Sequence, residues 1–421
     1  MKVLLLTQVL PYPPDSGPKV KTYNVIKYLS RRHEITLVSF IRAGESRHVG
    51  ELARFCARVH TVEMRRSSVR DARFLAASLL SHTPFLVCRD WSPEMGNLVR
   101  RLTREEQFDV VHVDQLGMAQ YARLAKGVHT VLDQHNAVYT VVRRLARAEG
   151  WRLRRPFLEL EWRKLRHYEG RVCAEFDHVL TVTDEDRQHL LEASHGRGSF
   201  STVPIAVDVE ETLPVQRRPD AKSVVSIATM YYPPNVDGVL WFATEVFPLI
   251  RRLAPATRFT VVGARPPMAV RRLTTRDPNI VVTGYVENLA PVLSDAALLI
   301  VPLRSGSGMR VKILEAFARG IPVVSTSIGC EGIDVTPGED ILVADAPLSF
   351  SQAVLRLLQD TPFAERLAAK ARCLVEKKYD WRTACAGIEA AYEARKDTNP
   401  LDSHAVTRHK ANTEGRFRMR S

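Results

Sequence analysis

Residues 302–324 read PLRSGSGMRVKILEAFARGIPVV, and this stretch predicts a strand, a glycine loop, a helix and a second strand in that order. The apolar run Ala296–Val301 leads into the loop. Apolar side chains then recur at helical spacing at Met309, Ile313, Leu314 and Phe317. Gly320 ends the predicted helix, and another apolar run follows it. A helix N-terminus therefore opens directly from a glycine-rich loop.

The first turn of this predicted helix carries two cations, Arg310 and Lys312. A helix N-terminus has free backbone N–H groups and the positive end of the helix dipole, so it attracts phosphate groups. Two cations there oppose the dipole, and a bound diphosphate would reverse the sign of the interaction. Glu315, one turn further on, could accept hydrogen bonds from the vicinal hydroxyls of a sugar. The alternative interpretation is a tight connection between strand and helix with solvated charges.

The length of the chain, 421 residues, exceeds one ordinary hydrophobic core and favours two domains of similar size. Hydrophobic residues make up 45% of the sequence and charged residues 25%, which is typical of a globular protein. The six cysteines are scattered without a Cys-x-x-Cys pair, which argues against a disulfide framework or a zinc site. We expect them to be small buried apolar residues in a reducing cytosol.

Apolar runs that predict strands alternate with helical patterns along both halves of the chain. The runs of the first half are Val3–Leu6, Ile35–Phe40, Arg58–Val62, Val110–Val113, Thr130–Asp133 and His178–Thr183. Those of the second half are Val224–Ala228, Phe259–Gly263, Ile280–Thr283, Ala297–Pro302, Pro322–Ser325 and Ile341–Val343. The alternation predicts an α/β protein made of two Rossmann-like domains with parallel sheets.

Residues 204–219 break this alternation with proline and charge, and we expect the two domains to join there. The first domain then spans 1–207 and the second 208–380, with a final helix at 381–395. Residues 396–421 have little apolar content and no periodicity, so we expect a disordered tail. Ligands of open parallel sheets bind beyond the carboxyl ends of the strands, which places the site in the cleft between the two sheets.

The string Gly-x-Gly-x-Arg-x-Lys-x-Leu-Glu-Ala-x-Ala-x-Gly-x-Pro-Val-Val, which begins at Gly306, closely resembles a known donor-binding segment. It is found in retaining glycosyltransferases of the GT-B fold, specifically glycosyltransferase family 4 as it occurs in bacterial sugar transferases of exopolysaccharide clusters. Residues 225–242 resemble the opening strand and loop of the donor domain in the same subgroup. The resemblance implies an acceptor domain at 1–207, a donor domain at 208–380, and a closing helix at 381–395 that packs back on the first domain.

Several donor-binding positions follow from this resemblance. Glu315 occupies the place of a glutamate that contacts the ribose of a nucleoside diphosphate sugar, whereas Ser307 stands where many members have a glutamate that touches the donor sugar. The loop 283–286 matches a segment that packs on the nucleotide base. The residues implied to bind the donor are Gly17, Tyr285, Val286, Ser307, Gly308, Met309, Val311 and Glu315. Tyr285 could equally pack in the core.

Polar side chains in the first half follow the predicted strands at their carboxyl ends. His135 aligns with a histidine that lies beside the transferring sugar in the family, and we expect it to act in catalysis with Arg310 and Lys312. Asp15, His112 and Asp114 are weaker candidates on the acceptor side. A lone histidine is usually structural, and Asp15 could be only a turn residue.

The predicted reaction moves a hexosyl unit from a nucleoside diphosphate sugar to a hydroxyl of a glycan, a lipid-linked acceptor or a small molecule. Retention of the anomeric configuration is implied by the resemblance alone. Helix amides with Arg310 and Lys312 would stabilise the departing diphosphate without a metal ion, and no Asp-x-Asp string lies in a plausible donor loop. We therefore expect no metal and no cofactor, with the nucleotide sugar as co-substrate and domain closure on binding.

Two rival functions remain open at the level of sequence. The first is a nucleotide-sugar epimerase or a phosphorylase on the same fold. The second is a noncatalytic basic protein that binds anionic lipid or nucleic acid. Release of free nucleoside diphosphate that depends on an acceptor would separate a transferase from an epimerase.

The net charge of +13 draws attention to residues 143–171, where arginines and lysines alternate with apolar residues. This pattern is typical of amphipathic helices, and a solvated face is the simpler interpretation. The sharper alternative is contact with an anionic membrane surface or a lipid phosphate. Nucleic acid is not expected because the aromatic stacking motifs of RNA-binding strands are absent.

The first ten residues are apolar but do not read as a secretory signal, because Gln8 interrupts them and proline follows at once. A buried parallel strand has the same appearance. No apolar run approaches the roughly 20 residues that are needed to cross a bilayer. We therefore expect a cytoplasmic bacterial protein, in peripheral contact with the inner face of the membrane if the basic region binds lipid.

Overall fold

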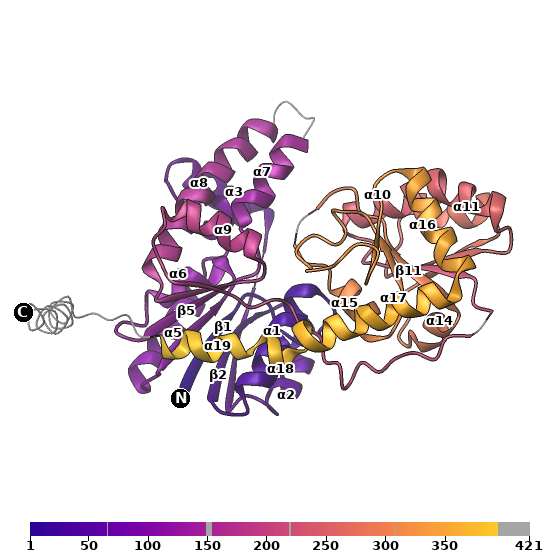
Figure 1. Ribbon diagram of the computed structural model, residues 1–421. Helices are drawn as coiled ribbons and strands as arrows, with labels where there is room; N and C mark the ends of the chain where they lie inside the picture. Colours follow the sequence, from indigo (N-terminus) through magenta and orange to yellow (C-terminus); the bar gives the residue numbers. More distant parts are fainter. Residues whose placement is uncertain (65, 149–153, 219, 307, 395–421) are drawn as a thin grey trace, which may run out of the picture.

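The computed structural model describes residues 1–64, 66–148, 154–218, 220–306 and 308–394. Ser307 and the expected tail at 396–421 lie outside the described residues. The chain forms two α/β domains side by side, each with a fully parallel sheet between layers of helices (Figure 1). This architecture confirms the prediction of a GT-B fold with two Rossmann-like domains.

The first sheet has seven strands in the order β3-β2-β1-β4-β5-β6-β7. Its strands are β1 (Lys2–Thr7), β2 (Glu34–Ile41), β3 (Arg58–Glu63), β4 (Val110–Asp114), β5 (His129–Gln134), β6 (His178–Thr181) and β7 (Phe200–Thr202). Side chains of β1 alternate between the faces: Val3 and Leu5 pack with α1 and α19, whereas Leu4 and Leu6 pack with α5 and α8. Helices on both faces explain why the run is continuously apolar.

The helices of this domain are α1 (Gly17–Leu29), α2 (Val49–Leu52), α3 (Ser68–Leu79), α4 (Phe85–Arg89), α5 (Pro93–Glu105), α6 (Ala119–Ala122), α7 (Val138–Ala148), α8 (Arg154–Glu175) and α9 (Asp184–Ala193). Three of them, α3, α7 and α8, project above the sheet as a helical crest (Figure 1). The sequence did not predict α3 or the short edge strand β7. Helix α3 has an exposed face with apolar residues, so it lacks the clear apolar stripe by which surface helices are recognised.

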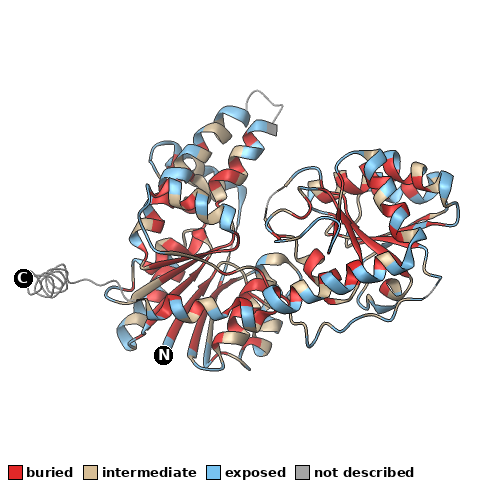
Figure 2. Cartoon of the chain, in the orientation of Figure 1, coloured by how far each residue is buried: buried red, intermediate tan, exposed pale blue. Residues whose placement is uncertain are grey.

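The second sheet has six strands in the order β10-β9-β8-β11-β12-β13. They are β8 (Ser223–Ile227), β9 (Arg258–Val262), β10 (Ile280–Gly284), β11 (Ala296–Val301), β12 (Val323–Ser325) and β13 (Leu342–Val343). The helices are α10 (Pro233–Trp241), α11 (Phe247–Leu253), α12 (Met268–Arg271), α13 (Leu273–Arg276), α14 (Ala290–Ser294), α15 (Val311–Ala318), α16 (Pro347–Gln359) and α17 (Thr361–Leu374). Every residue of β11 is buried, with α16 on one face and α15 and α17 on the other (Figure 2).

The last described helices, α18 (Trp381–Ala384) and α19 (Ala386–Glu393), cross from the second domain to the first and pack beneath the first sheet (Figure 1). The expected helix at 381–395 is thus two short helices that meet at Cys385. Trp381 is fully buried, and the guanidinium of Arg31 lies 4.4 Å from its ring centroid. Such cation–π and apolar contacts hold the crossing segment on the first domain.

None of the described helices has both the length and the apolar content that a membrane crossing requires.

Candidate functional site between the two domains

The donor side of the site is the glycine loop before α15. Gly306 and Gly308 have φ angles of 120° and 85°, which glycine adopts without the strain that other residues would suffer. The guanidinium of Arg310 folds back over this loop, and its Nη1 donates a hydrogen bond to the carbonyl of Gly308. A Cβ atom at Gly306 would come within 3.0 Å of Arg310 Nη2. The loop therefore has to be glycine-rich to make room for the cation.

Lys312 lies in the first turn of α15 and points towards α10. Its Nζ donates a hydrogen bond to Asn235 Oδ1 at 3.3 Å, and Asn235 Nδ2 in turn donates to the carbonyl of Thr229 at 2.9 Å. Among the described residues, no carboxylate forms an ion pair with Lys312. Burial and the nearby charge of Arg310 lower the pKa of Lys312 to about 7. Burial also lowers the pKa of Arg310. These two positions favour an anionic ligand.

The pKa of Lys312 leads to a prediction for nucleotide binding. A bound diphosphate raises this pKa, so binding takes up a proton whenever the pH lies above about 7. The affinity for a nucleoside diphosphate should therefore be greatest near or below pH 7 and fall by up to about tenfold per pH unit above pH 8. Calorimetry in buffers of different ionisation enthalpy measures both quantities. The variant Lys312→Arg should lose this dependence; an unchanged pH profile in that variant would contradict the assignment.

Glu315 lies one turn after Lys312 and is half-buried. Burial raises the pKa of its carboxyl, and no hydrogen bond or ion pair within the described ranges involves its side chain. Its oxygens are thus open to a ligand's hydroxyl groups. Met309 is buried in the apolar cluster around α15, so only its main chain could contact a donor. Val311 is half-buried at the first position of the helix.

Two other donor-side predictions differ in their surroundings. The side chain of Val286 packs against the cluster formed by Val225, Val262 and Ala296. Tyr285, by contrast, is 76% exposed, so it does not pack in the core and is open to stack on a ligand. Both follow Gly284, whose φ angle of 76° turns the chain at the end of β10.

The acceptor side of the site lies at the carboxyl ends of β4 and β5. His135 is buried, with Nε2 2.9 Å from Asp114 Oδ1. Neither ring nitrogen of His135 forms a hydrogen bond within the part of the chain that the structure describes, although Nε2 lies this close to Asp114. Thr22 of α1 donates to the same Asp114 oxygen at 2.9 Å. Asp114 therefore lies beside His135, and both ring nitrogens of His135 are left for a ligand.

A buried ion pair supports this region. Lys21 and Asp133 bond to each other and are both almost fully buried. Burial alone would raise the pKa of Asp133, but the charge of Lys21 holds it well below its usual range. Ligand atoms of Asp114, Asp133 and His135 lie within 4.8 Å of one another, a spacing that could hold a metal ion. The Lys21 ammonium bonds to Asp133 Oδ1, whereas Asp133 Oδ2 has no hydrogen-bond partner among the described residues. Independence from metal stays a prediction.

The structure places His112 away from the cleft. Its side chain is buried on the face of the sheet that α19 covers, and its Nδ1 lies 2.8 Å from the hydroxyl of Tyr392. This placement corrects the expectation of an acceptor contact, because the closing helix lies between His112 and any ligand on that face. Asp15 is exposed and pairs with Lys19 one turn later, which fits its interpretation as a turn residue.

The two domains touch at glycines. A Cβ atom at Gly308 would come within 2.6 Å of Asn136 Oδ1, and one at Gly332 within 2.6 Å of Thr183 Cγ2. A Cβ atom at Gly17, at the start of α1, would lie 3.6 Å from Val311 Cγ2, which is an ordinary van der Waals contact. Close approach of the two faces therefore depends on missing side chains at Gly308 and Gly332. These contacts bring the glycine loop next to the residue that follows His135.

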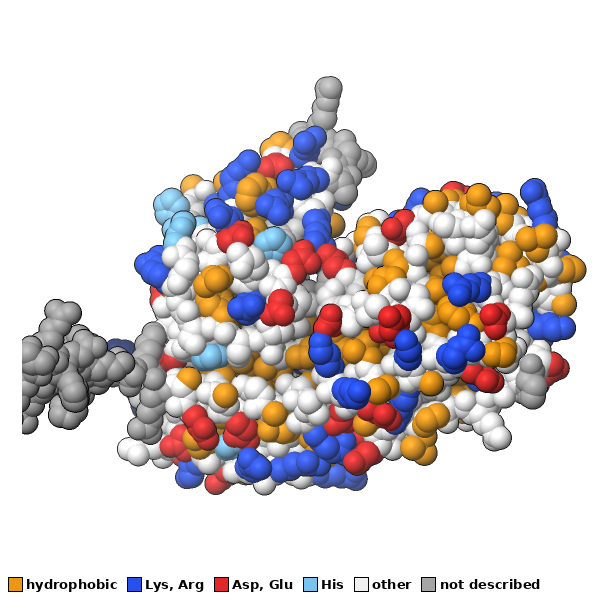
Figure 3. Space-filling view, viewed as in Figure 1, with side chains coloured by type: hydrophobic (Ala, Val, Ile, Leu, Met, Phe, Trp, Pro, Cys, Tyr) orange, Lys and Arg blue, Asp and Glu red, His pale blue; other side chains and the backbone are white. Residues whose placement is uncertain are grey.

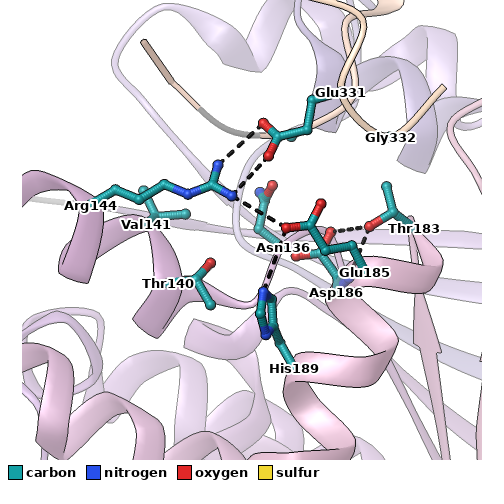
Figure 4. Close-up of a pocket in the computed structure, with 11 residues that line it drawn as sticks. Asn136, Thr140, Val141, Arg144, Thr183, Glu185, Asp186, His189, Glu331 and Gly332 are labelled. Carbon is teal, nitrogen blue, oxygen red and sulfur yellow. Dashed lines mark hydrogen bonds and ion pairs between the residues drawn. The ribbon is translucent and has the colours of Figure 1, made fainter. Parts of the chain in front are cut away.

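A cavity of about 20 Å³ lies between these faces and is lined by both domains (Figure 4). Its lining includes Asn136, Arg144, Thr183, Glu185, Gly308 and Glu331. Of these, only Gly308 was predicted to be a site residue, and Arg144 was noted only as part of the basic region 143–171. Asn136 and Thr183 could have been found because each follows the carboxyl end of a strand; the pairing of Arg144 with Glu331 has no local signal.

A second cavity, of about 190 Å³, is lined by His135 and shares Asn136 with the first cavity. Its polar lining residues are Gln8, Arg89, Asp90, Gln115, Gln134, His135 and Asn136. Amide, carboxylate and guanidinium groups are the usual partners of sugar hydroxyls. This cavity is the candidate acceptor site.

Family models describe both domains. Residues 16–211 match the model "Glycosyltransferase Family 4" and residues 221–360 match "Glycosyl transferases group 1". The chain belongs to glycosyltransferase family 4. The first match ends and the second begins in the segment that joins the two sheets, so each domain of this glycosyltransferase has its own match.

Solved structures share the fold of this glycosyltransferase at low sequence identity. Sucrose-phosphate synthase from Thermosynechococcus elongatus has a TM-score of 0.68 at 14% identity, covering 93% of this chain and 98% of that one. HepE from Anabaena, solved with UDP and glucose, has a TM-score of 0.64 at 14% identity, covering 94% and 100%. TarM has a TM-score of 0.67 at 11% identity, covering 93% and 98%.

Among curated proteins, an uncharacterized 44.6 kDa protein in a cps region of Klebsiella pneumoniae is 22% identical over 173 residues. The match covers 39% of this chain and 45% of that protein, so the chain spans less than half of this relative's length.

Proposed function

We propose that this glycosyltransferase moves a hexosyl unit from a nucleoside diphosphate sugar to a hydroxyl of a glycan, a lipid-linked acceptor or a small molecule, with retention of the anomeric configuration. The observation that carries the proposal is the pair Arg310 and Lys312, half-buried cations at a helix N-terminus across the cleft from His135. Lys312 has no carboxylate partner among the described residues, and a buried ammonium of this kind is costly unless an anion neutralises it.

Each residue has a role in this proposal. The amides of the first turn of α15, with Arg310 and Lys312, stabilise the diphosphate as it departs. Glu315 accepts hydrogen bonds from the ribose hydroxyls, and Tyr285 lies beside the base. His135 donates or accepts a hydrogen bond at the transferring sugar through Nδ1. The group therefore needs no metal ion for charge stabilisation.

The proposed transfer needs no reactant other than the donor and the acceptor. The bond between the anomeric carbon and the diphosphate oxygen breaks, and the diphosphate leaves with the electron pair. The acceptor oxygen bonds to the anomeric carbon on the same face, and its proton passes to an oxygen of the leaving group. Retention follows because the leaving group guides the acceptor to the face that it departs from.

The supporting comparisons concern other proteins. HepE binds UDP and glucose in its solved structure, and TarM of S. aureus was solved with UDP and α-GlcNAc-glycerol. The relative in a cps region supports polysaccharide biosynthesis as the setting. We place the reaction in the bacterial cytoplasm.

We further propose that residues 143–171 contact an anionic membrane surface. Lys and Arg side chains gather on the α7 and α8 part of the helical crest (Figure 3). Leu145 and Leu160 are exposed among them. Apolar side chains between cations are suited to the interface of a membrane that carries anionic lipids. Residues Trp151, Arg152 and Leu153 of this region lie outside the described residues.

Replacing Glu315 with alanine tests the donor site. We expect nucleoside diphosphate affinity to fall by about 1–3 kcal/mol, because the ribose loses its hydrogen-bond acceptor. Calorimetry with UDP and GDP measures it. The matched control is Glu339→Ala, which removes an exposed carboxylate that pairs with Lys370 elsewhere on the same domain. Equal affinities in the two variants would refute the assignment of Glu315.

The identity of the donor can be found by thermal stabilisation. A ligand that binds only the folded protein raises its stability with the logarithm of ligand concentration. A panel of nucleotide sugars should thus single out the donor. Free nucleoside diphosphate that appears only when an acceptor is present would then exclude an epimerase, and no stabilisation by any nucleotide would favour a noncatalytic binding protein.

A further inference from the structure

An ion pair crosses the cleft next to the glycine loop. Arg144 of α7 reaches from the first domain, and its Nη2 donates to Glu331 Oε1 at 2.8 Å (Figure 4). Its Nη1 donates to Glu331 Oε2 at 3.2 Å, and also to the carbonyl of Gly306 at 3.2 Å. The guanidinium is therefore held in bidentate fashion by the second domain.

The hydrogen bond from Arg144 to the carbonyl of Gly306 connects this ion pair to the donor loop. Gly306 begins the loop that leads into the first turn of α15. A hydrogen bond to its carbonyl therefore restrains the orientation of the donor loop. Arg144 is also close enough to Arg310 to lower its pKa, whereas Glu331 raises it. The cross-cleft pair thus lies beside the cation that we assign to the diphosphate, and the effects of its two charges on that cation oppose each other.

The strength of the pair suits a contact that forms and breaks. The side chains of Arg144 and Glu331 are 42% and 22% exposed. Ion pairs with this much exposure are weak, because water competes for both charges. Glu185 of α9 lies 3.4 Å from Arg144 Nη2 and offers the guanidinium a partner within its own domain. Arg144 would therefore keep an acceptor if the two domains moved apart.

We propose that Arg144 is a positioning residue, which docks the first domain on the donor loop through Gly306 and Glu331 and so sets the distance between the leaving group and His135. The inference rests on the proposed function for its effect on turnover. Its effect on the arrangement of the two domains is independent of any ligand. Small-angle scattering and kinetics can therefore separate the two.

The decisive experiment reverses the two charges singly and together. In Arg144→Glu, and likewise in Glu331→Arg, like charges face each other, and we expect a larger radius of gyration than in the wild type. Turnover of the nucleotide sugar selected by stabilisation should fall about tenfold or more in kcat, because the reacting groups are misplaced. Affinity for UDP or GDP alone should change by less than about threefold. The double variant should restore the radius and a large part of kcat.

The matched control is Arg187→Glu, which makes the same charge change on the same domain but breaks only a pair with Asp184 within α9. It should leave both the scattering and kcat unchanged. The proposal is overturned if the single reversals scatter like the wild type, or if the double reversal restores neither quantity. A protein that scatters as expected but binds no nucleotide would instead contradict the proposed function.

A steric variant tests the same docking without changing charge. Gly332→Ala places a methyl group against Thr183 across the cleft at a residue with φ of 79°. Its control is Gly338→Ala, which has φ of 87° and open space around the added methyl group. Both variants suffer the same backbone strain, and only Gly332→Ala should enlarge the radius of gyration and lower kcat. Equal behaviour of the two variants would show that these faces do not dock in solution.

Discussion

Replacing Lys312 with methionine should lower kcat/KM for glycosyl transfer by about a hundredfold or more, because a positioned charge that stabilises a leaving group typically contributes this much. The ammonium lies in the first turn of α15 without a carboxylate partner among the described residues. It is therefore available to the diphosphate, on which negative charge develops as the sugar departs. Methionine keeps the length of the side chain and removes only the charge.

This variant also has an effect that distinguishes it from a damaged fold. Burial and Arg310 lower the pKa of Lys312 to about 7. Below that pH the charged lysine therefore lowers the free energy of unfolding. The cost is present below the folded pKa and disappears as the pH rises towards the usual lysine value. At pH 6 the methionine variant should thus be at least as stable as the wild type in urea unfolding.

The control for Lys312→Met is Lys370→Met, an exposed lysine of the same domain that pairs with Glu339. It should retain activity within about threefold, as surface ion pairs contribute little. If both variants kept the kcat/KM of the wild type, the diphosphate would have to be held by groups other than Lys312. Initial rates with the identified donor, measured below KM, give the comparison directly.

Replacing Lys21 with methionine should lower the free energy of unfolding of the first domain by about 3–5 kcal/mol, because it leaves the Asp133 carboxylate buried without its partner. Lys21 holds the pKa of Asp133 well below its usual range. In the wild type this pair contributes stability that is present above the unfolded pKa of about 4 and lost as the pH falls. The destabilisation should consequently shrink in acid, where Asp133 is protonated in the variant.

Urea unfolding followed by circular dichroism measures this effect at pH 7 and at pH 4.5. The companion variant Lys21→Met with Asp133→Leu removes both charges and should regain most of the lost stability, since an apolar pair can replace a buried ion pair. A loss that is equally large in the double variant would mean that the shape of the lysine, and not the charge left on Asp133, supports the edge of the sheet. The single variant should also disturb His135, because Asp133, the partner of Lys21, lies in β5 only two residues before it.

The fold could be predicted from local patterns because its central strands are short and buried on both faces. The run Val3–Leu6 of β1 and all of β11 are continuously apolar, and such runs read as parallel strands. The donor loop could be predicted for a related reason. Gly306, Gly308, Arg310, Lys312 and Glu315 lie within one turn and one helix, so their spacing in the chain is also their spacing in space.

The acceptor side of the site could not be predicted from local sequence patterns. His112 and Asp114 lie on the same face of β4, two residues apart, but α19 contacts the first, whereas the second lies 2.9 Å from His135 Nε2. Which helix covers that face is decided by a segment some 280 residues away, which no periodicity reveals.

The chain by itself determined two parallel sheets, the glycine loop and a cationic first turn, because apolar alternation and backbone freedom act between near neighbours. Tertiary structure alone decided that Arg144 meets Glu331 and that Asn136 meets Gly308. These residues are brought together only when two separately folded domains pack, and packing depends on the shapes and charges of whole surfaces.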